Sequence, residues 1–120
     1  MKKLVFILFF FSFNFYAQTA NYSDLKFKAN FKEYISKSGR SIKVNDTIQI
    51  GLPSAGNNFV FITQGNVGVM PSLAKTKAII TNIKSIGTDK TGYKIYLLFK
   101  GYGLLPVYID YENAIETGEL

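Results

Sequence analysis

The sequence predicts a mainly β protein: a small, partly open antiparallel barrel or sandwich with a short C-terminal helix. Turn-forming Gly, Asn and Asp residues recur at short intervals, the runs between them are rich in Ile, Val, Phe and Tyr, and helical periodicity is almost absent. The chain has 120 residues. That length indicates a single folded domain, since it buries enough surface to fold alone.

The N-terminal segment 1–17 has the layout of a secretory signal peptide. Lys2 and Lys3 precede an apolar run at 4–13, and the segment ends at Ala17. A retained membrane anchor is the alternative, but the apolar run is shorter than the roughly 20 residues of a spanning helix. We therefore expect an exported protein, periplasmic or extracellular, that meets a membrane only through this segment if it stays uncleaved. The rest of the chain comprises a flexible start at 18–23 and one β domain at 24–120.

Short strands fill the first half of the domain, and we expect them at 25–32, 41–44, 47–52 and 58–63. Apolar and polar side chains alternate through the first of these, as in a half-buried strand. A helix at 30–37 is the alternative, because Phe31, Tyr34 and Ile35 follow helical spacing. The second and third strands flank a turn formed by Asn45 and Asp46. The fourth contains a continuous apolar run, so we expect it to be buried on both faces.

Segments 76–86 and 93–101 predict the two arms of a hairpin, joined by the polar loop 87–92. In the second arm Ile95, Leu97 and Phe99 alternate with mostly polar residues, so this face of the strand should belong to the core. A last strand is expected at 105–109. Pro106 lies near its start, where a missing backbone N–H does no harm.

The C-terminus predicts a short helix at 111–117. Asp110 suits the N-cap, Glu112 lies in the first turn, where negative charge favours the helix dipole, and Gly118 suits the residue after the last turn. We expect Ala114 and Ile115 to dock this helix against the core.

Composition excludes several kinds of chemistry. The chain has no His and no Cys, which excludes Ser-His-Asp and Cys-His catalysis, thiol redox reactions, disulfides and ordinary zinc sites. Asp46 and Asp89 lie in turns, and neither begins a loop of alternating oxygen ligands for calcium. We therefore expect no cofactor and no metal, and a binding or structural module of the envelope rather than an enzyme.

Basic residues outnumber acidic ones. Fourteen Lys and Arg residues against eight Asp and Glu give a net charge of +6, and the leader holds two of the lysines, so the remainder carries +4. The candidate ligand-binding residues are lysines and one tyrosine on two expected strands: Lys26, Lys28, Lys94, Tyr96 and Lys100. Such a surface suits an anionic polymer, such as a glycan, or an acidic envelope protein, although lysines on strands also prevent edge-to-edge aggregation. Because export is expected, nucleic acid is not an expected partner.

Two other functions compete with this binding surface. A small proteinaceous inhibitor would insert a loop, at 51–58 or 87–92, into the site of its partner. A hydrolase would use Asp110 and Glu112, since glycoside hydrolysis needs two carboxyl groups about 5 to 10 Å apart. The start of a helix explains both acids equally well.

The segment 39–54 reads Gly-Arg-Ser-Ile-Lys-Val-Asn-Asp-Thr-Ile-Gln-Ile-Gly-Leu-Pro-Ser. It resembles the hydrophobic-Gly-Asp-hydrophobic-x-hydrophobic-Gly turn of many small β-barrels, with Asn45 in the usual glycine position. Together with the leader and the ending Glu-Asn-Ala-Ile-Glu-Thr-Gly-Glu, it makes the chain similar to uncharacterised exported small β-barrel proteins of bacteria. The resemblance implies a barrel architecture and an envelope location, and it carries no activity or functional residue.

Overall fold

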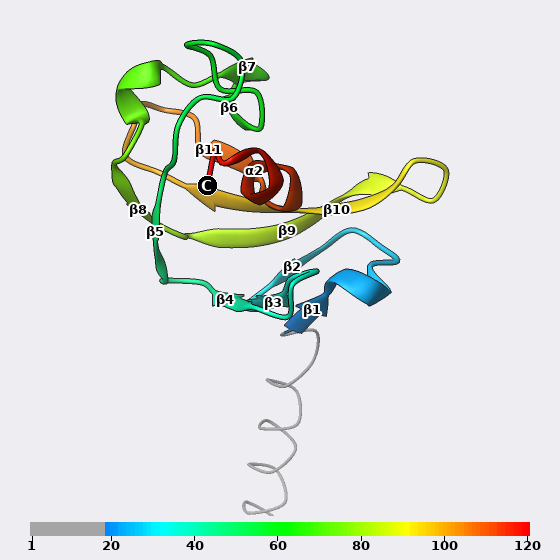
Figure 1. Cartoon of the computed structure of the whole chain (residues 1–120). Coiled ribbons are helices and arrows are strands. Elements are labelled where there is room, and N and C mark those ends of the chain that lie inside the picture. The colour runs from blue at the N-terminus through cyan, green and yellow to red at the C-terminus, as the bar shows by residue number, and fades with distance from the viewer. Residues whose placement is uncertain (1–18) are drawn as a thin grey trace, which may run out of the picture.

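The computed structural model describes residues 19–120, and the expected signal peptide at 1–17 lies outside them. The protein is mainly β, with three sheets and one short C-terminal α-helix (Figure 1). Over the described residues the strands form no closed barrel, so the fold is a partly open sandwich. The fold class expected from the turn spacing is confirmed.

The largest sheet has six strands, and all its neighbouring pairs are antiparallel. In spatial order they are β2 (Ala29–Phe31), β9 (Asn82–Thr88), β10 (Gly92–Phe99), β11 (Val107–Asp110), β6 (Ile62–Gln64) and β7 (Val67–Gly68). The expected hairpin is confirmed as β9 and β10, and its tip projects from the body of the molecule (Figure 1). Its first arm is shorter than expected, because Lys77–Ile79 forms a separate strand, β8, in another sheet.

Two small sheets complete the sandwich. One contains β1 (Thr19–Asn21), β3 (Glu33–Ile35) and β4 (Ser41–Lys43), and the other pairs β5 (Thr47–Gln49) with β8. Strand β1 runs parallel to β3 and leads into a 3-10 turn, η1 (Tyr22–Asp24). A second 3-10 turn, η2 (Pro71–Leu73), precedes β8.

The hydrophobic core lies between the front face of the six-stranded sheet and the two small sheets. Ile95, Leu97 and Phe99 of β10 are buried in it, as their alternation predicts. Tyr34 of β3 and Ile50, which follows β5, meet them from the other layer. The core therefore joins all three sheets into one packed unit.

The C-terminal helix α2 (Tyr111–Thr117) begins and ends where the sequence predicts. Gly118 has the left-handed backbone conformation expected of a helix end, with φ of 84°. Ala114 is buried as expected, but Ile115 is 41 % exposed, so its predicted docking role is wrong. Tyr111 takes that role, because the helix turns its first residue toward the core.

Several of the expected strands are shorter in the structure, and the alternative helix at 30–37 does not form. Only Ala29–Phe31 of the segment 25–32 joins the sheet. At the start of this strand, the hydroxyl of buried Ser85 makes the hydrogen bonds that the backbone of a neighbouring strand would otherwise make. It accepts from the Ala29 N–H at 2.9 Å and donates to the Phe27 carbonyl at 2.5 Å. Phe27 itself is 56 % exposed.

The apolar run at 59–62 is not buried on both faces. Phe59 and Ile62 are buried, whereas Val60 is 47 % exposed. The N–H groups of Val60 and Phe61 meet no neighbouring strand and donate instead to the carboxylate of Glu119, at 2.8 and 2.7 Å. The regular strand therefore begins only at Ile62.

Candidate functional site

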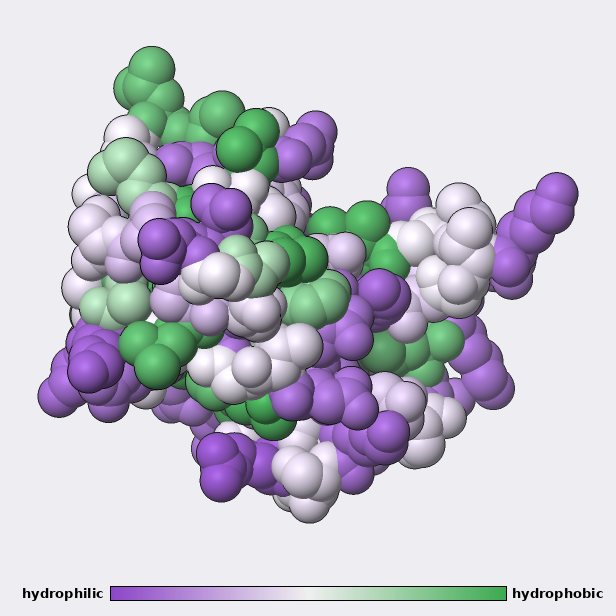
Figure 2. Space-filling view, turned by 45° about the horizontal axis from the view of Figure 1, so that its top comes forward, coloured by the Kyte–Doolittle hydropathy of each residue, from purple (hydrophilic) through white to green (hydrophobic). Residues whose placement is uncertain are grey.

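A groove of about 760 Å³ opens between the start of α2, the turn from β3 to β4, η1 and the first half of β10. Four tyrosines from four separate elements line it: Tyr22 of η1, Tyr34 of β3, Tyr93 of β10 and Tyr111 of α2. We call it the tyrosine groove. Figure 2 shows hydrophilic and hydrophobic side chains interleaved on this side of the molecule, between the body and the projecting hairpin.

The floor of the tyrosine groove is held by Tyr34 and Tyr111, whose rings meet edge to face with centroids 5.7 Å apart. The Tyr34 hydroxyl donates to the carboxylate of Glu112, and the backbone N–H of Lys37 donates to the same oxygen at 3.2 Å. Burial, and then the neighbouring Glu112 carboxylate, raise the pKa of Tyr34 well above its ordinary value. Tyr34 therefore stays a neutral hydrogen-bond donor in this site.

The rim of the groove carries balanced charge. Its lining includes three cations and three carboxylates: Lys37, Arg40, Lys94, Asp110, Glu112 and Glu116. Lys94 Nζ lies 3.3 Å from Asp110 Oδ2, and the Asn113 amide donates to that oxygen at 2.9 Å. The Lys94 side chain is 58 % exposed, whereas that of Asp110 is 12 % exposed. Lys94 is therefore the member of this pair that a ligand can reach.

The carboxylates of the groove have partners within the chain. Asp110 occupies the N-cap position, as predicted, but its side chain makes no bond to the helix backbone and accepts from Lys94 and Asn113 instead. Glu112 accepts from Tyr34 and Lys37. Each acid proposed for a hydrolase thus accepts two hydrogen bonds from this chain, an arrangement typical of carboxylates that position other groups.

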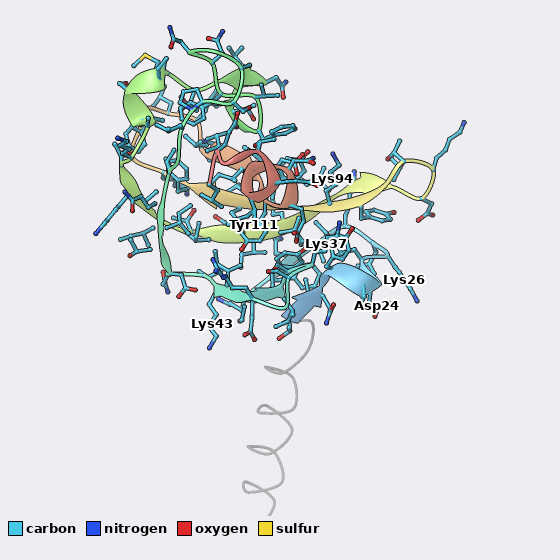
Figure 3. All side chains as sticks on the ribbon, in the orientation of Figure 1. Asp24, Lys26, Lys37, Lys43, Lys94 and Tyr111 are labelled. Carbon is cyan, nitrogen blue, oxygen red and sulfur yellow. The ribbon has the colours of Figure 1, made fainter. Side chains whose placement is uncertain are left out.

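The structure brings together two of the five residues chosen from the sequence. Lys94 and Tyr96 alternate on one face of β10, where Tyr96 lies opposite Lys84 of β9 and its ring meets that of Tyr108 at 6.2 Å. Only Lys94 also reaches the groove, over the edge of β10 (Figure 3).

The other three lysines lie apart from that pair. Lys26 makes an exposed ion pair with Asp24, at 3.2 Å. Lys28 precedes β2, two strands from β10, and Lys100 follows the end of β10, about 20 Å along the strand from Lys94. The five side chains therefore form no single patch.

Sequence reasoning missed the tyrosines of the groove. Tyr22, Tyr34, Tyr93 and Tyr111 are far apart along the chain and share no periodicity. Tyr34 stood out only as part of a helical pattern that does not form. The groove forms because β1 pairs in parallel with β3 and because α2 packs beside β10. No local sequence pattern predicts either contact.

Within residues 19–120, no three metal-ligating side chains lie close enough to hold an ion. The same stretch holds no helix with the length and apolar character needed to cross a membrane. Comparison of the chain with protein-family models, with curated proteins and with solved structures finds no match.

Proposed function

We propose that this protein is a non-enzymatic binding module of the bacterial envelope that holds its ligand in the tyrosine groove. The observation that supports this function is the convergence of four tyrosines from four elements on one hollow. Tyrosine side chains offer large, amphipathic contact area and lose little conformational entropy when they bind. The segment 1–17 supports export to the envelope.

The charge distribution favours a ligand of net negative charge. Residues 18–120 carry +4, while the three cations and three carboxylates of the groove cancel. The excess positive charge therefore lies outside the groove lining. A net positive charge attracts an anionic ligand to the protein, and this attraction weakens as salt rises.

Capture from an envelope extract tests this function. The protein, purified from the envelope fraction and immobilised, is compared with Tyr22→Ala and with Tyr108→Ala, which changes a tyrosine on the opposite face of the sheet. We expect Tyr22→Ala to reduce capture of the specific ligand at least tenfold and Tyr108→Ala to leave it unchanged. Equal capture by all three proteins would exclude the groove as the binding site.

The projecting hairpin supports a second candidate function, a small proteinaceous inhibitor. Its tip is fixed by reciprocal bonds between Thr88 and Thr91, at 3.1 and 3.2 Å, and by the Tyr93 hydroxyl, which donates to Asp89 at 2.9 Å. A preordered, projecting loop suits insertion into a partner's site. Here Asp89→Ala with Lys90→Ala should abolish partner binding while Tyr22→Ala leaves it intact, the reverse of what the groove requires.

A further inference from the structure

Five apolar or aromatic side chains are exposed where β7 and the loop between β10 and β11 meet. They are Val67, Met70, Tyr102, Leu104 and Leu105, and we call this set the apolar end. Figure 2 shows hydrophobic side chains projecting on the side of the molecule away from the hairpin. We propose that the apolar end inserts into the surface of a bilayer that contains anionic phospholipids.

The side chains of the apolar end are unusually exposed for their size. Leu104 is completely exposed, and Val67, Met70 and Leu105 are each more than half exposed. Single exposed apolar residues are common on protein surfaces, whereas several that lie together mark an interaction surface. The apolar end therefore suits a partner that removes these side chains from water.

Hydrogen bonds hold the two parts of the apolar end together. The side-chain amide of Gln64, the last residue of β6, donates to the Tyr102 and Leu105 carbonyls, both at 2.7 Å. Leu105 also lies against the turn between β6 and β7, because a Cβ added at Gly65 would be 3.3 Å from its Cδ1 atom. The loop is thus fixed on both sides of Leu104, and an ordered backbone presents that side chain to solvent.

The part of the chain that forms the apolar end is basic. Lys100 directly precedes the loop, Lys75 lies two residues after η2, and both lysines are exposed. The sequence has no Asp or Glu at 47–88 or 90–109, the ranges that contain the whole apolar end. Glu119, which bonds to the neighbouring segment, is completely buried. Apolar side chains flanked by lysines match a bilayer with anionic headgroups, because the apolar area and the positive charge both favour binding.

A bilayer suits the apolar end better than a second copy of this chain does. Fluid lipid can surround a projecting side chain such as Leu104 without a preformed pocket. Tyr102 adds a residue type that is enriched at the level of the headgroups. Two copies that met through their apolar ends would bring Lys75 and Lys100 of each close to those of the other, and like charges repel.

The apolar end is separate from the tyrosine groove, so this proposal does not rest on the proposed function. Among the described residues, the lining of the groove includes none of the apolar end. Lys94 lines the groove, and Lys100 lies about 20 Å farther along β10. Insertion of the apolar end therefore leaves the groove accessible from water. It also adds a membrane contact to the one expected of the segment 1–17.

A single introduced tryptophan tests insertion, because the chain has none of its own. Leu104→Trp places the fluorophore on the apolar end. Phe27→Trp places it at an exposed position before β2, the opposite edge strand of the six-stranded sheet from β7. With vesicles of mixed phosphatidylglycerol and phosphatidylcholine, we expect the Leu104→Trp emission to shift to shorter wavelength and to be quenched by brominated lipid. The Phe27→Trp emission should stay unchanged.

Sedimentation with the same vesicles separates the apolar contribution from that of charge. Leu104→Gln should weaken binding about fivefold, whereas Phe27→Gln should leave it unchanged. Lys100→Glu should weaken binding about tenfold, and Lys28→Glu, the same charge change just before β2, should weaken it much less. All four residues are exposed, so circular dichroism should show the natural fold in every variant.

Four results would overturn insertion of the apolar end. They are no binding to the mixed vesicles, equal binding to vesicles of phosphatidylcholine alone, an equal emission shift in both tryptophan variants, and a dimer that Leu104→Gln abolishes. The segment 1–17 is the same in every variant, so it cannot cause a difference between them. Tyr22→Ala should bind vesicles as the natural protein does. Vesicle binding and capture from envelope extract can therefore fail independently of each other.

Discussion

The carboxylate of Glu119 accepts a 2.7 Å hydrogen bond from the backbone N–H of Phe61, 58 residues earlier in the chain. Glu119 is completely buried and also accepts from the N–H groups of Val60 and Ser54, at 2.8 and 3.2 Å, and from the Ser54 hydroxyl. A buried charge is stable only when such donors surround it. This carboxylate therefore fixes the segment 54–61 where no strand does.

Replacement of Glu119 by Gln should strongly destabilise the protein. The amide retains the size of the side chain but loses charge-assisted hydrogen bonds and turns a donor toward other donors, at a cost of about 2 to 4 kcal/mol in the free energy of unfolding. Glu116→Gln, at an exposed position of α2, is the matched control and should change stability by less than about 0.5 kcal/mol. Urea denaturation measures both, and similar values for the two variants would contradict this role.

The stability of the protein should fall in acid because of the same residue. Burial alone raises the pKa of Glu119, but the hydrogen bonds from Ser54, Val60 and Phe61 outweigh burial and hold the pKa below its usual value. A lowered pKa in the folded state gives stabilisation that is present above the unfolded pKa, about 4.3, and is lost as pH falls through the folded pKa. Melting temperatures from pH 7 to pH 2 should show this loss, and Glu119→Gln should show a flatter profile.

Tyr34→Phe should separate the floor of the groove from Glu112. The variant removes the hydroxyl donor and leaves Glu112 with the Lys37 N–H, which should cost about 1 to 2 kcal/mol in unfolding free energy. Because the pKa of Tyr34 is raised, its stabilisation is present below the unfolded pKa of about 10 and is lost as pH rises through the folded value. Stability measured from pH 8 to pH 12 should therefore decline less in Tyr34→Phe than in the natural protein.

Gly51→Ala should disturb the packing of Gly118 and Glu119 against the backbone at position 51. A Cβ at position 51 would lie 2.1 Å from the Gly118 carbonyl oxygen, yet the Gly51 N–H must donate to the Glu119 carbonyl at 2.8 Å. Gly56→Ala meets open space and bears only the left-handed backbone cost of about 1 kcal/mol. Thermal unfolding should place Gly51→Ala clearly below Gly56→Ala, and the opposite order would show that the backbone there moves freely.

Local patterns predicted the elements whose causes are local. The β9–β10 hairpin and α2 follow from residues adjacent in sequence, such as the alternation up to Phe99 and the position of Gly118. The shorter strands do not, because Ser85 and Glu119 replace ladder bonds with side-chain bonds from distant parts of the chain. No periodicity records such a replacement.

The candidate site likewise contains some residues that a local pattern predicts and others that only distant contacts bring together. Lys94 was recognised from its place on an alternating strand, and it lines the groove. The tyrosines were missed because their proximity depends on β1, which has no strand pattern, and on the turn of the chain into α2 at Tyr111.

The hydrogen bonds between the Glu119 carboxylate and the segment 54–61 also have a consequence for the order of folding. The Glu119 carboxylate follows every described strand in the chain, so the segment 54–61 gains its acceptor only after those strands have been synthesised. Until then, the N–H groups of Ser54, Val60 and Phe61 lack the acceptor that they have in the folded protein. For an exported protein, as we propose for this one, we expect this late contact to delay closure of the segment 54–61 until the strands are in place.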